Sequence, residues 1–144
     1  MHILGAIEPA RDIGWFATCP TLKATGLISF FTNLLQQYPS GNLNIVLDNA
    51  KVHHSKKIQD FLDFHQRIKL KYLPPYSPDL NPIEKFWKFV RQQVTHNTYY
   101  PEFEEFQTTI VDFLSSFLHP QGIIKSLCNM YRIPLQTPIA TEAV

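Results

Sequence analysis

Four prolines within nine residues make the stretch from Pro74 to Pro82 the stiffest part of the chain. Proline fixes its own φ and moves the preceding residue away from the α region, so this stretch is predicted to be an extended loop and not a helix. Asn81 and Pro82 then suit the N-cap and first position of a new helix. Its apolar residues recur at helical spacing: Ile83, Phe86, Trp87, Val90 and Val94. Glu84 therefore falls in the first turn of this helix, beside the apolar stripe.

Glu84 has two interpretations. It can close a capping box with Asn81 and complement the positive end of the helix dipole, which is a purely structural role. It can also act together with a second acid, and the chain offers one in Asp48. The choice between the two interpretations depends on where Asp48 lies.

Asp48 follows the short apolar run Ile45–Leu47, which predicts a buried strand ending at this acid. The structural alternative is an Asx turn, in which Asp48 and Asn49 bind nearby backbone amides. In open α/β sheets, however, functional sites gather at the carboxyl ends of strands. An Asp at a strand end and a Glu at a helix start are an arrangement that can hold a divalent cation through oxygen ligands.

The remaining elements follow from the hydrophobic pattern. We expect a hairpin from residues 2–8 and 14–19, a helix from about residue 25 to 38, a helix after Ser55 and a strand over residues 68–73. The predicted order is ββαβαβ, followed by the helix of Glu84. A further helix from Pro101 is expected to point these residues inward: Phe103, Phe106, Ile110, Phe113, Leu114 and Phe117.

Length and composition bound the class of protein. A chain of 144 residues with 44% hydrophobic content suits one compact domain. No apolar run approaches the roughly 20 residues that cross a bilayer, and no signal peptide is recognisable, so we expect an intracellular protein. Cys19 and Cys128 stand far apart and suggest neither a disulfide framework nor a zinc site.

Positive charge is concentrated around the two acids. Residues 48–91 contain nine Lys and Arg against five Asp and Glu, a net charge of +4, whereas the whole chain carries only +1. Such cations can meet phosphates, the source of most sequence-independent affinity for DNA. Each of them could equally lie on a solvated face without a partner. The candidates for DNA binding are Lys51, Lys56, Lys57, Lys85, Lys88 and Arg91.

Two blocks of the sequence, DNAKVHHS at residues 48–55 and PPYSPDLNPIEKFWK at residues 74–88, resemble the signature blocks of the mariner-like DDE transposases. The resemblance is closest to the bacterial insertion-sequence branch, and the acids Asp48 and Glu84 stand 36 positions apart. It covers roughly residues 2–118. It implies an α/β fold with a ribonuclease H-like mixed sheet flanked by helices. Residues 1–118 would form a partial DDE endonuclease domain, and residues 119–144 a tail with one short helix.

The resemblance also implies roles for individual residues. Asp48 and Glu84 would be catalytic metal ligands, and the complete site would hold two Mg²⁺ or Mn²⁺ ions. Asn49, His53 and Asn81 would support them, with His53 orienting Asp48 or meeting a phosphate. The resemblance gives no role to the neighbouring His54.

The family's sheet has a central first strand that carries the first catalytic Asp, and a DNA-binding region precedes it. This chain opens at Met1 in what resembles the second strand, so we expect that first strand and its acid to be lacking; Glu8 and Asp12 are poor substitutes. The hairpin and the Asp48 strand would then lose a shared partner. Unpaired strand edges predict a marginally stable fold.

The favoured function is that of the C-terminal part of an insertion-sequence transposase catalytic domain. It would cleave DNA and transfer a strand, with metal ions, once its missing part is supplied. The alternative is a non-catalytic remnant that binds DNA or a full-length transposase. The sequence leaves open whether this chain alone is an enzyme. Expected partners are DNA and either a second copy or the upstream half of a split transposase, in the cytoplasm on the nucleoid and not at a membrane.

Overall fold

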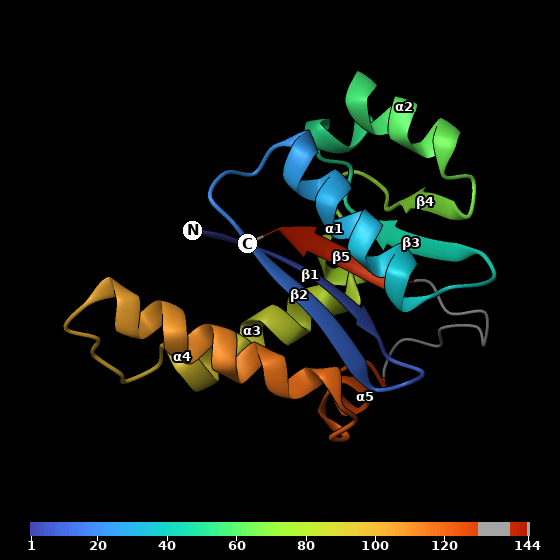
Figure 1. Ribbon diagram of the computed structural model, residues 1–144. Coiled ribbons are helices and arrows are strands. Elements are labelled where there is room, and N and C mark those ends of the chain that lie inside the picture. The colour runs from blue at the N-terminus through green and yellow to red at the C-terminus, as the bar shows by residue number, and fades with distance from the viewer. Residues whose placement is uncertain (130–138, 144) are drawn as a thin grey trace.

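The chain folds into one mixed five-stranded sheet with helices on both faces (Figure 1). This computed structural model describes residues 1–129 and 139–143, with the side chains of Pro78 and of 139–143 left out of the description. The strands are β1 His2–Glu8, β2 Ile13–Cys19, β3 Leu43–Leu47, β4 Ile68–Tyr72 and β5 Ile139–Ala143. The α-helices are α1 Ala24–Gln37, α2 Lys56–Phe64, α3 Pro82–Val94, α4 Phe103–Ser115 and α5 Ile123–Leu127. Short 3-10 helices are η1 Lys51–His54, η2 Pro78–Leu80 and η3 Ser116–Leu118.

The strand order is β2-β1-β5-β3-β4, so the strand latest in the sequence lies in the middle of the sheet. β5 pairs antiparallel with β1, where Ala6 faces Thr141, and parallel with β3, where Leu47 faces the same Thr141. The expectation that the hairpin and the Asp48 strand lack a shared partner is therefore wrong. Residues 139–143 supply hydrogen bonds to both, which satisfies backbone groups that would otherwise be left unpaired.

The sheet separates two hydrophobic cores. Alternate residues of β1 point to opposite faces, as the pleat of a strand requires. Leu4 and Ala6 pack with α1 and α2, while Ile3 and Ile7 pack with α3, η3 and α5. Figure 1 shows this three-layer arrangement, with α1 and α2 on one side of the strands and α3, α4 and α5 on the other.

Gly5 allows α3 to approach the sheet closely. A Cβ atom at Gly5 would lie 2.6 Å from Cζ2 of Trp87 and 2.9 Å from Cδ1 of Phe16, closer than real Cβ contacts occur. Trp87 is only 2% exposed, and its ring packs edge-on against Phe16 with centroids 5.7 Å apart. Because Gly5 has no side chain, the Trp87 indole can pack directly over this position of β1.

Most predicted elements are present, with two corrections. The order ββαβαβ followed by the Glu84 helix is confirmed, and the mixed α/β class with it. α4 begins at Phe103 and not at Pro101, and Phe103 is 56% exposed although it was expected to point inward. It stands at the very start of the helix, where its ring lies beside that of Phe106 with centroids 6.1 Å apart. For the tail, the spacing of Ile123, Ile124, Leu127 and Met130 predicts one short helix; α5 covers the first three, and Met130 lies outside the described residues.

The predicted division at residue 118 is a statement about family boundaries and stays a prediction. In the structure, α5 and β5 come from beyond it, and β5 completes the sheet. Within residues 1–129 and 139–143, no helix is long and apolar enough to cross a membrane.

Thr141 tests the role of β5, because it pairs with strands on both sides. We expect Thr141→Pro to lower the free energy of unfolding by about 1–3 kcal/mol or more, since proline removes a backbone N–H from the centre of the sheet. Urea denaturation measures the loss. Thr141→Val, which keeps the N–H and favours strands, is the matched control. Equal stability of the two variants would contradict the pairing.

Candidate active site

Asp48 and Glu84 line the same cavity, of about 360 Å³, at the carboxyl ends of β3 and β4. Asp48 directly follows β3, and Glu84 lies in the first turn of α3. The loop that joins β4 to α3 forms the remaining wall. Its members are Leu73, Pro74, Pro75, Tyr76 and Ser77, and the lining is completed by Asn49, Ala50 and Asn81.

The start of α3 has the predicted form. Asn81 is the N-cap, Pro82 follows at the first helical position, and Asn81 Oδ1 accepts a hydrogen bond from the backbone N–H of Ile83 at 3.4 Å. The buried residues of α3 face the sheet, while Glu84 is half-buried and reaches the cavity. Glu84 thus stands at a helix start as the structural interpretation requires, and it also shares a cavity with Asp48.

Asp48 likewise satisfies both of its interpretations. Its Oδ1 accepts a hydrogen bond from the backbone N–H of Ala50 at 3.1 Å, which is the predicted Asx turn. The side chain is nevertheless 52% exposed and lines the cavity. An Asx turn fixes the carboxylate of Asp48 at the end of β3 without removing it from solvent.

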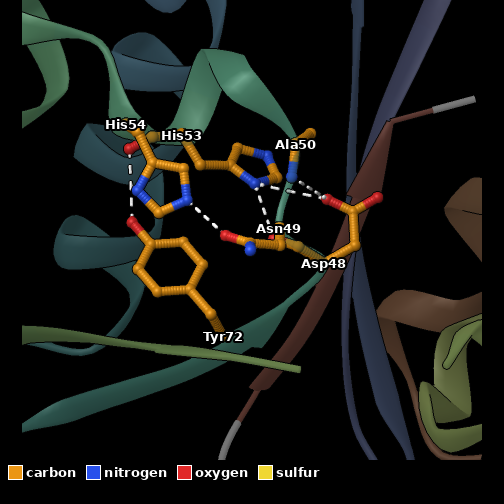
Figure 2. Close-up of polar contacts among 6 residues, drawn as sticks. All are labelled: Asp48, Asn49, Ala50, His53, His54 and Tyr72. Carbon is orange, nitrogen blue, oxygen red and sulfur yellow. Dashed lines mark hydrogen bonds and ion pairs between the residues drawn. The ribbon is translucent and has the colours of Figure 1, made fainter. Parts of the chain in front are cut away.

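His53 holds Asp48 from the protein side. Its Nδ1 lies 2.9 Å from the backbone carbonyl oxygen of Asp48 and 3.3 Å from the carboxylate Oδ1 (Figure 2). Because a carbonyl oxygen only accepts, Nδ1 must donate, which sets the tautomer of the neutral ring. Burial lowers the pKa of His53 below its ordinary value, although the carbonyl and carboxylate of Asp48 oppose this shift. The imidazole is thus a buried neutral donor that orients Asp48.

His54, to which the sequence assigned no role, supports Asn49 in a parallel way. Its Nε2 donates to Oδ1 of Asn49, and its ring packs on Tyr72 with centroids 4.4 Å apart (Figure 2). Each histidine stands five residues after the residue it contacts, Asp48 and Asn49 respectively. This repeated spacing was visible in the sequence and could have predicted the second contact.

None of the residues predicted to bind DNA is among the residues that line the cavity. Lys51 directly follows Ala50, and Lys85 directly follows Glu84, so each adjoins a lining residue. Lys88 and Arg91 are exposed on α3 at four and seven residues after Glu84, which places them on the same helical face. Lys56 and Lys57 are exposed at the start of α2, and Lys56 pairs weakly with Asp60 at 3.9 Å.

Other acids near the N-terminus are committed to structural contacts. Glu8 accepts a hydrogen bond from Tyr38 and pairs with Arg11 at 3.5 Å. Asp12 accepts hydrogen bonds from the backbone of Gln121, Gly122 and Lys125 and so caps the start of α5. Neither acid is among the residues that line the cavity.

The donors around the cavity have the chemistry that Mg²⁺ or Mn²⁺ prefers. Carboxylate oxygens of Asp48 and Glu84 face a space open to water, and hard divalent cations bind oxygen ligands while keeping several waters. Over the described part of the chain, however, no group of three or more His, Cys, Asp or Glu side chains is placed to hold a metal. The cavity thus offers two carboxylates, those of Asp48 and Glu84, as oxygen donors for such an ion.

His53 makes the stability of the fold depend on pH. The pKa of His53 is lower in the folded chain than in the unfolded chain, so below about pH 6.5 the unfolded state binds more protons and stability falls with falling pH. We expect His53→Gln to weaken this dependence between about pH 7 and 5, as measured by thermal melts in EDTA. The same substitution at the exposed His96 controls for the loss of an imidazole. Identical pH slopes in wild type and His53→Gln would contradict the buried neutral ring.

Comparison with known proteins identifies the family. The model of the DDE superfamily endonuclease family matches residues 1–107. The chain is 34% identical over 109 residues to the Tc3 transposase of Caenorhabditis elegans, covering 75% of this chain and 32% of that protein. It is 26% identical over 108 residues to the uncharacterized protein y4pE/y4sA of Sinorhizobium fredii, covering 74% of this chain and 77% of that protein.

A third relative is the uncharacterized 39 kDa protein of insertion element IS630 from Shigella sonnei. It is 29% identical over 55 residues, 38% of this chain and 16% of that protein. The chain thus spans about a third of the Tc3 transposase and a smaller part of the IS630 protein. The family match covers well over half of the 144 residues and includes both acids of the cavity. The chain belongs to the DDE superfamily of endonucleases, in the mariner-like group whose members include the Tc3 transposase and the IS630 protein.

Proposed function

We propose that this chain is part of an insertion-sequence transposase catalytic domain of ribonuclease H-like type, in which Asp48 and Glu84 bind Mg²⁺ or Mn²⁺ beside a DNA phosphodiester. The observation that carries this proposal is the cavity that the two carboxylates share at the carboxyl ends of parallel strands. In the completed domain, water attacks phosphorus and the P–O3′ bond breaks, which leaves a 5′-phosphate and a free 3′-hydroxyl. That hydroxyl then attacks a phosphodiester of target DNA, so that a new P–O3′ bond forms while the target strand's own P–O3′ bond breaks and leaves a 3′-hydroxyl on the target strand.

The residues of the chain have separate tasks in this reaction. Bound metal would supply Lewis-acid polarisation of the phosphodiester. Asp48 is oriented for this purpose by its Asx turn and by its contacts with His53, while its carboxylate stays partly exposed. Glu84 is held by the packing of α3, whose buried face fixes the direction of the first turn. Asn49 and Asn81 support the two acids at the cavity wall.

Exposed cations that follow the two acids in the sequence offer DNA a path beside the cavity. Lys51, Lys56 and Lys57 follow Asp48 in η1 and at the start of α2, and Lys88 and Arg91 follow Glu84 along one face of α3. Phosphates flanking the scissile bond can meet these groups and release counterions. DNA is therefore the proposed partner, with a second copy or an upstream transposase segment completing the site in the cytoplasm, on the nucleoid.

A second function is favoured by one observation. Among the side chains that the structure describes, which exclude those of residues 139–143, no group of three or more His, Cys, Asp or Glu is placed to hold a metal, whereas two-metal phosphoryl transfer uses carboxylates that clamp both ions. The chain alone would then be a non-catalytic remnant that binds DNA or a full-length transposase. The two functions share the DNA-binding surface and differ in cleavage.

Metal binding separates the catalytic role of Glu84 from a capping role. We expect Asp48→Asn and Glu84→Gln each to weaken Mn²⁺ binding by roughly tenfold or more, since each removes a charged ligand. Calorimetric titration measures the affinity, and thermal melts measure stability in parallel. Glu104→Gln, which removes an exposed acid in the first turn of α4, is the matched control. Unchanged Mn²⁺ affinity with a lowered melting temperature would return Glu84 to a purely structural role.

The cation path predicts how DNA binding responds to salt. Binding should be insensitive to sequence and fall steeply with salt, and loss of each phosphate contact should reduce the log–log salt slope by roughly one. We expect Lys88→Gln and Arg91→Gln to have this effect on duplex DNA in fluorescence anisotropy. Lys125→Gln removes the same charge from α5 and serves as the control. If the salt slope changes equally in all three variants, Lys88 and Arg91 do not contact phosphates and the proposed DNA-binding role of this face of α3 is wrong.

A further inference from the structure

Tyr76 has an arrangement that the fold does not explain. Its side chain is fully exposed, at 103% of the reference area, and its backbone is left-handed with φ +57°. For a residue other than glycine this conformation is unfavourable by roughly 1–2 kcal/mol. Two other described non-glycine residues share it, Asp12 and Asn97, and both belong to the short polar types that tolerate it. Tyrosine has neither that tolerance nor, at this position, any burial.

The surrounding loop holds Tyr76 in a defined place. Pro74 and Pro75 precede it and fix the backbone, while the Ser77 hydroxyl donates to the carbonyl of Pro75 at 3.3 Å. The backbone N–H of Leu80 donates to the carbonyl of Ser77 at 3.1 Å. A ring carried by so stiff a loop loses little conformational entropy when it binds a ligand.

Tyr76 also lines the cavity of Asp48 and Glu84. An apolar protein surface would bind poorly at this cavity, because its binding would remove water from the carboxylates of Asp48 and Glu84. A nucleotide suits both the cavity and the aromatic ring beside it. Its phosphate would enter the cavity with a metal ion, and its base would contact the ring of Tyr76 at the rim. Bases stack on exposed aromatic side chains regardless of sequence.

We propose that Tyr76 stacks on an unpaired base of the nucleotide next to the phosphate bound at Asp48 and Glu84, and so positions the DNA strand. This inference rests on the proposed function, because it takes DNA as the ligand of the cavity. A base inside a duplex already has both faces covered by its neighbours. Tyr76 therefore favours single-stranded or frayed DNA over intact duplex.

The test measures binding of the full chain to a single-stranded oligonucleotide that contains 2-aminopurine, a base whose fluorescence is quenched by stacking. Ca²⁺ replaces Mg²⁺ in the assay so that the oligonucleotide is bound and not cleaved. We expect wild type to quench the fluorescence and Tyr76→Asn to abolish the quenching and weaken single-strand binding by roughly five- to hundredfold. Asparagine tolerates the left-handed backbone, so this variant removes the ring without straining the loop. Tyr76→Phe keeps the ring and should retain both the quenching and the affinity.

Tyr99 provides the matched control. It is 86% exposed, lies in the loop between α3 and α4, and is not part of the cavity wall. Tyr99→Asn should leave quenching and affinity at wild-type values. Equal behaviour of Tyr76→Asn and Tyr99→Asn would overturn the proposal, as would an equal loss on duplex and single-stranded DNA, or an effect of Tyr76→Asn on self-association alone.

The outcomes also separate this inference from the proposed function. One outcome is that DNA binding keeps its steep salt dependence and its sensitivity to Lys88→Gln, while Tyr76→Asn has no effect. In that case the proposed stacking by Tyr76 is wrong, and the proposed DNA-binding surface is retained. If wild type binds no DNA at low salt, the proposed function fails, and stacking fails with it. Loss of quenching in Tyr76→Asn with an unchanged melting temperature would support a role in positioning the strand.

Discussion

The geometry of the candidate active site depends on the absence of a side chain at Gly5, which lets α3 pack closely on the sheet. The Trp87 indole occupies the space above this glycine, where a Cβ would come within 2.6 Å of the ring. Trp87 follows Glu84 by three residues on α3, so the depth of its insertion sets the height of the first helical turn over the sheet. Asp48 is fixed to the same sheet by β3. The relative placement of the two carboxylates thus depends on strand pairing within the sheet and on the packing of α3 against it, to which the close approach of Trp87 to Gly5 contributes.

Local patterns predicted most of the fold because most of its elements are amphipathic. The buried face of α3 and the alternation in β4 are both legible in a single pass along the sequence. β5 could not be found in this way. Its residues, IATEA, include two alanines and a glutamate, which are weak strand formers, and the run is only five residues long. Its central place comes from the two strand edges that it joins, which are distant in sequence.

For the candidate site, the sequence predicted where its two acids lie but not all of the contacts around them. Asp48 and Glu84 were singled out by their positions at a strand end and a helix start and by the motif blocks around them, and the structure brings them to one cavity. The contact between His54 and Asn49 was encoded in a spacing of five that the sequence repeats. The exposure and left-handed backbone of Tyr76 are properties of the folded loop, and the composition of a proline-rich segment does not specify them.

The central position of β5 also has a consequence for folding kinetics. Leu4 pairs with Ala143, a sequence separation of 139 residues, so the sheet contains contacts of very high contact order. Such topologies fold slowly, because a long loop must close before any of its hydrogen bonds form. During synthesis, β1 and β3 emerge from the ribosome with open edges long before β5. Nascent chains are therefore exposed to edge-to-edge association, and their yield should depend on chaperones that cover strand edges.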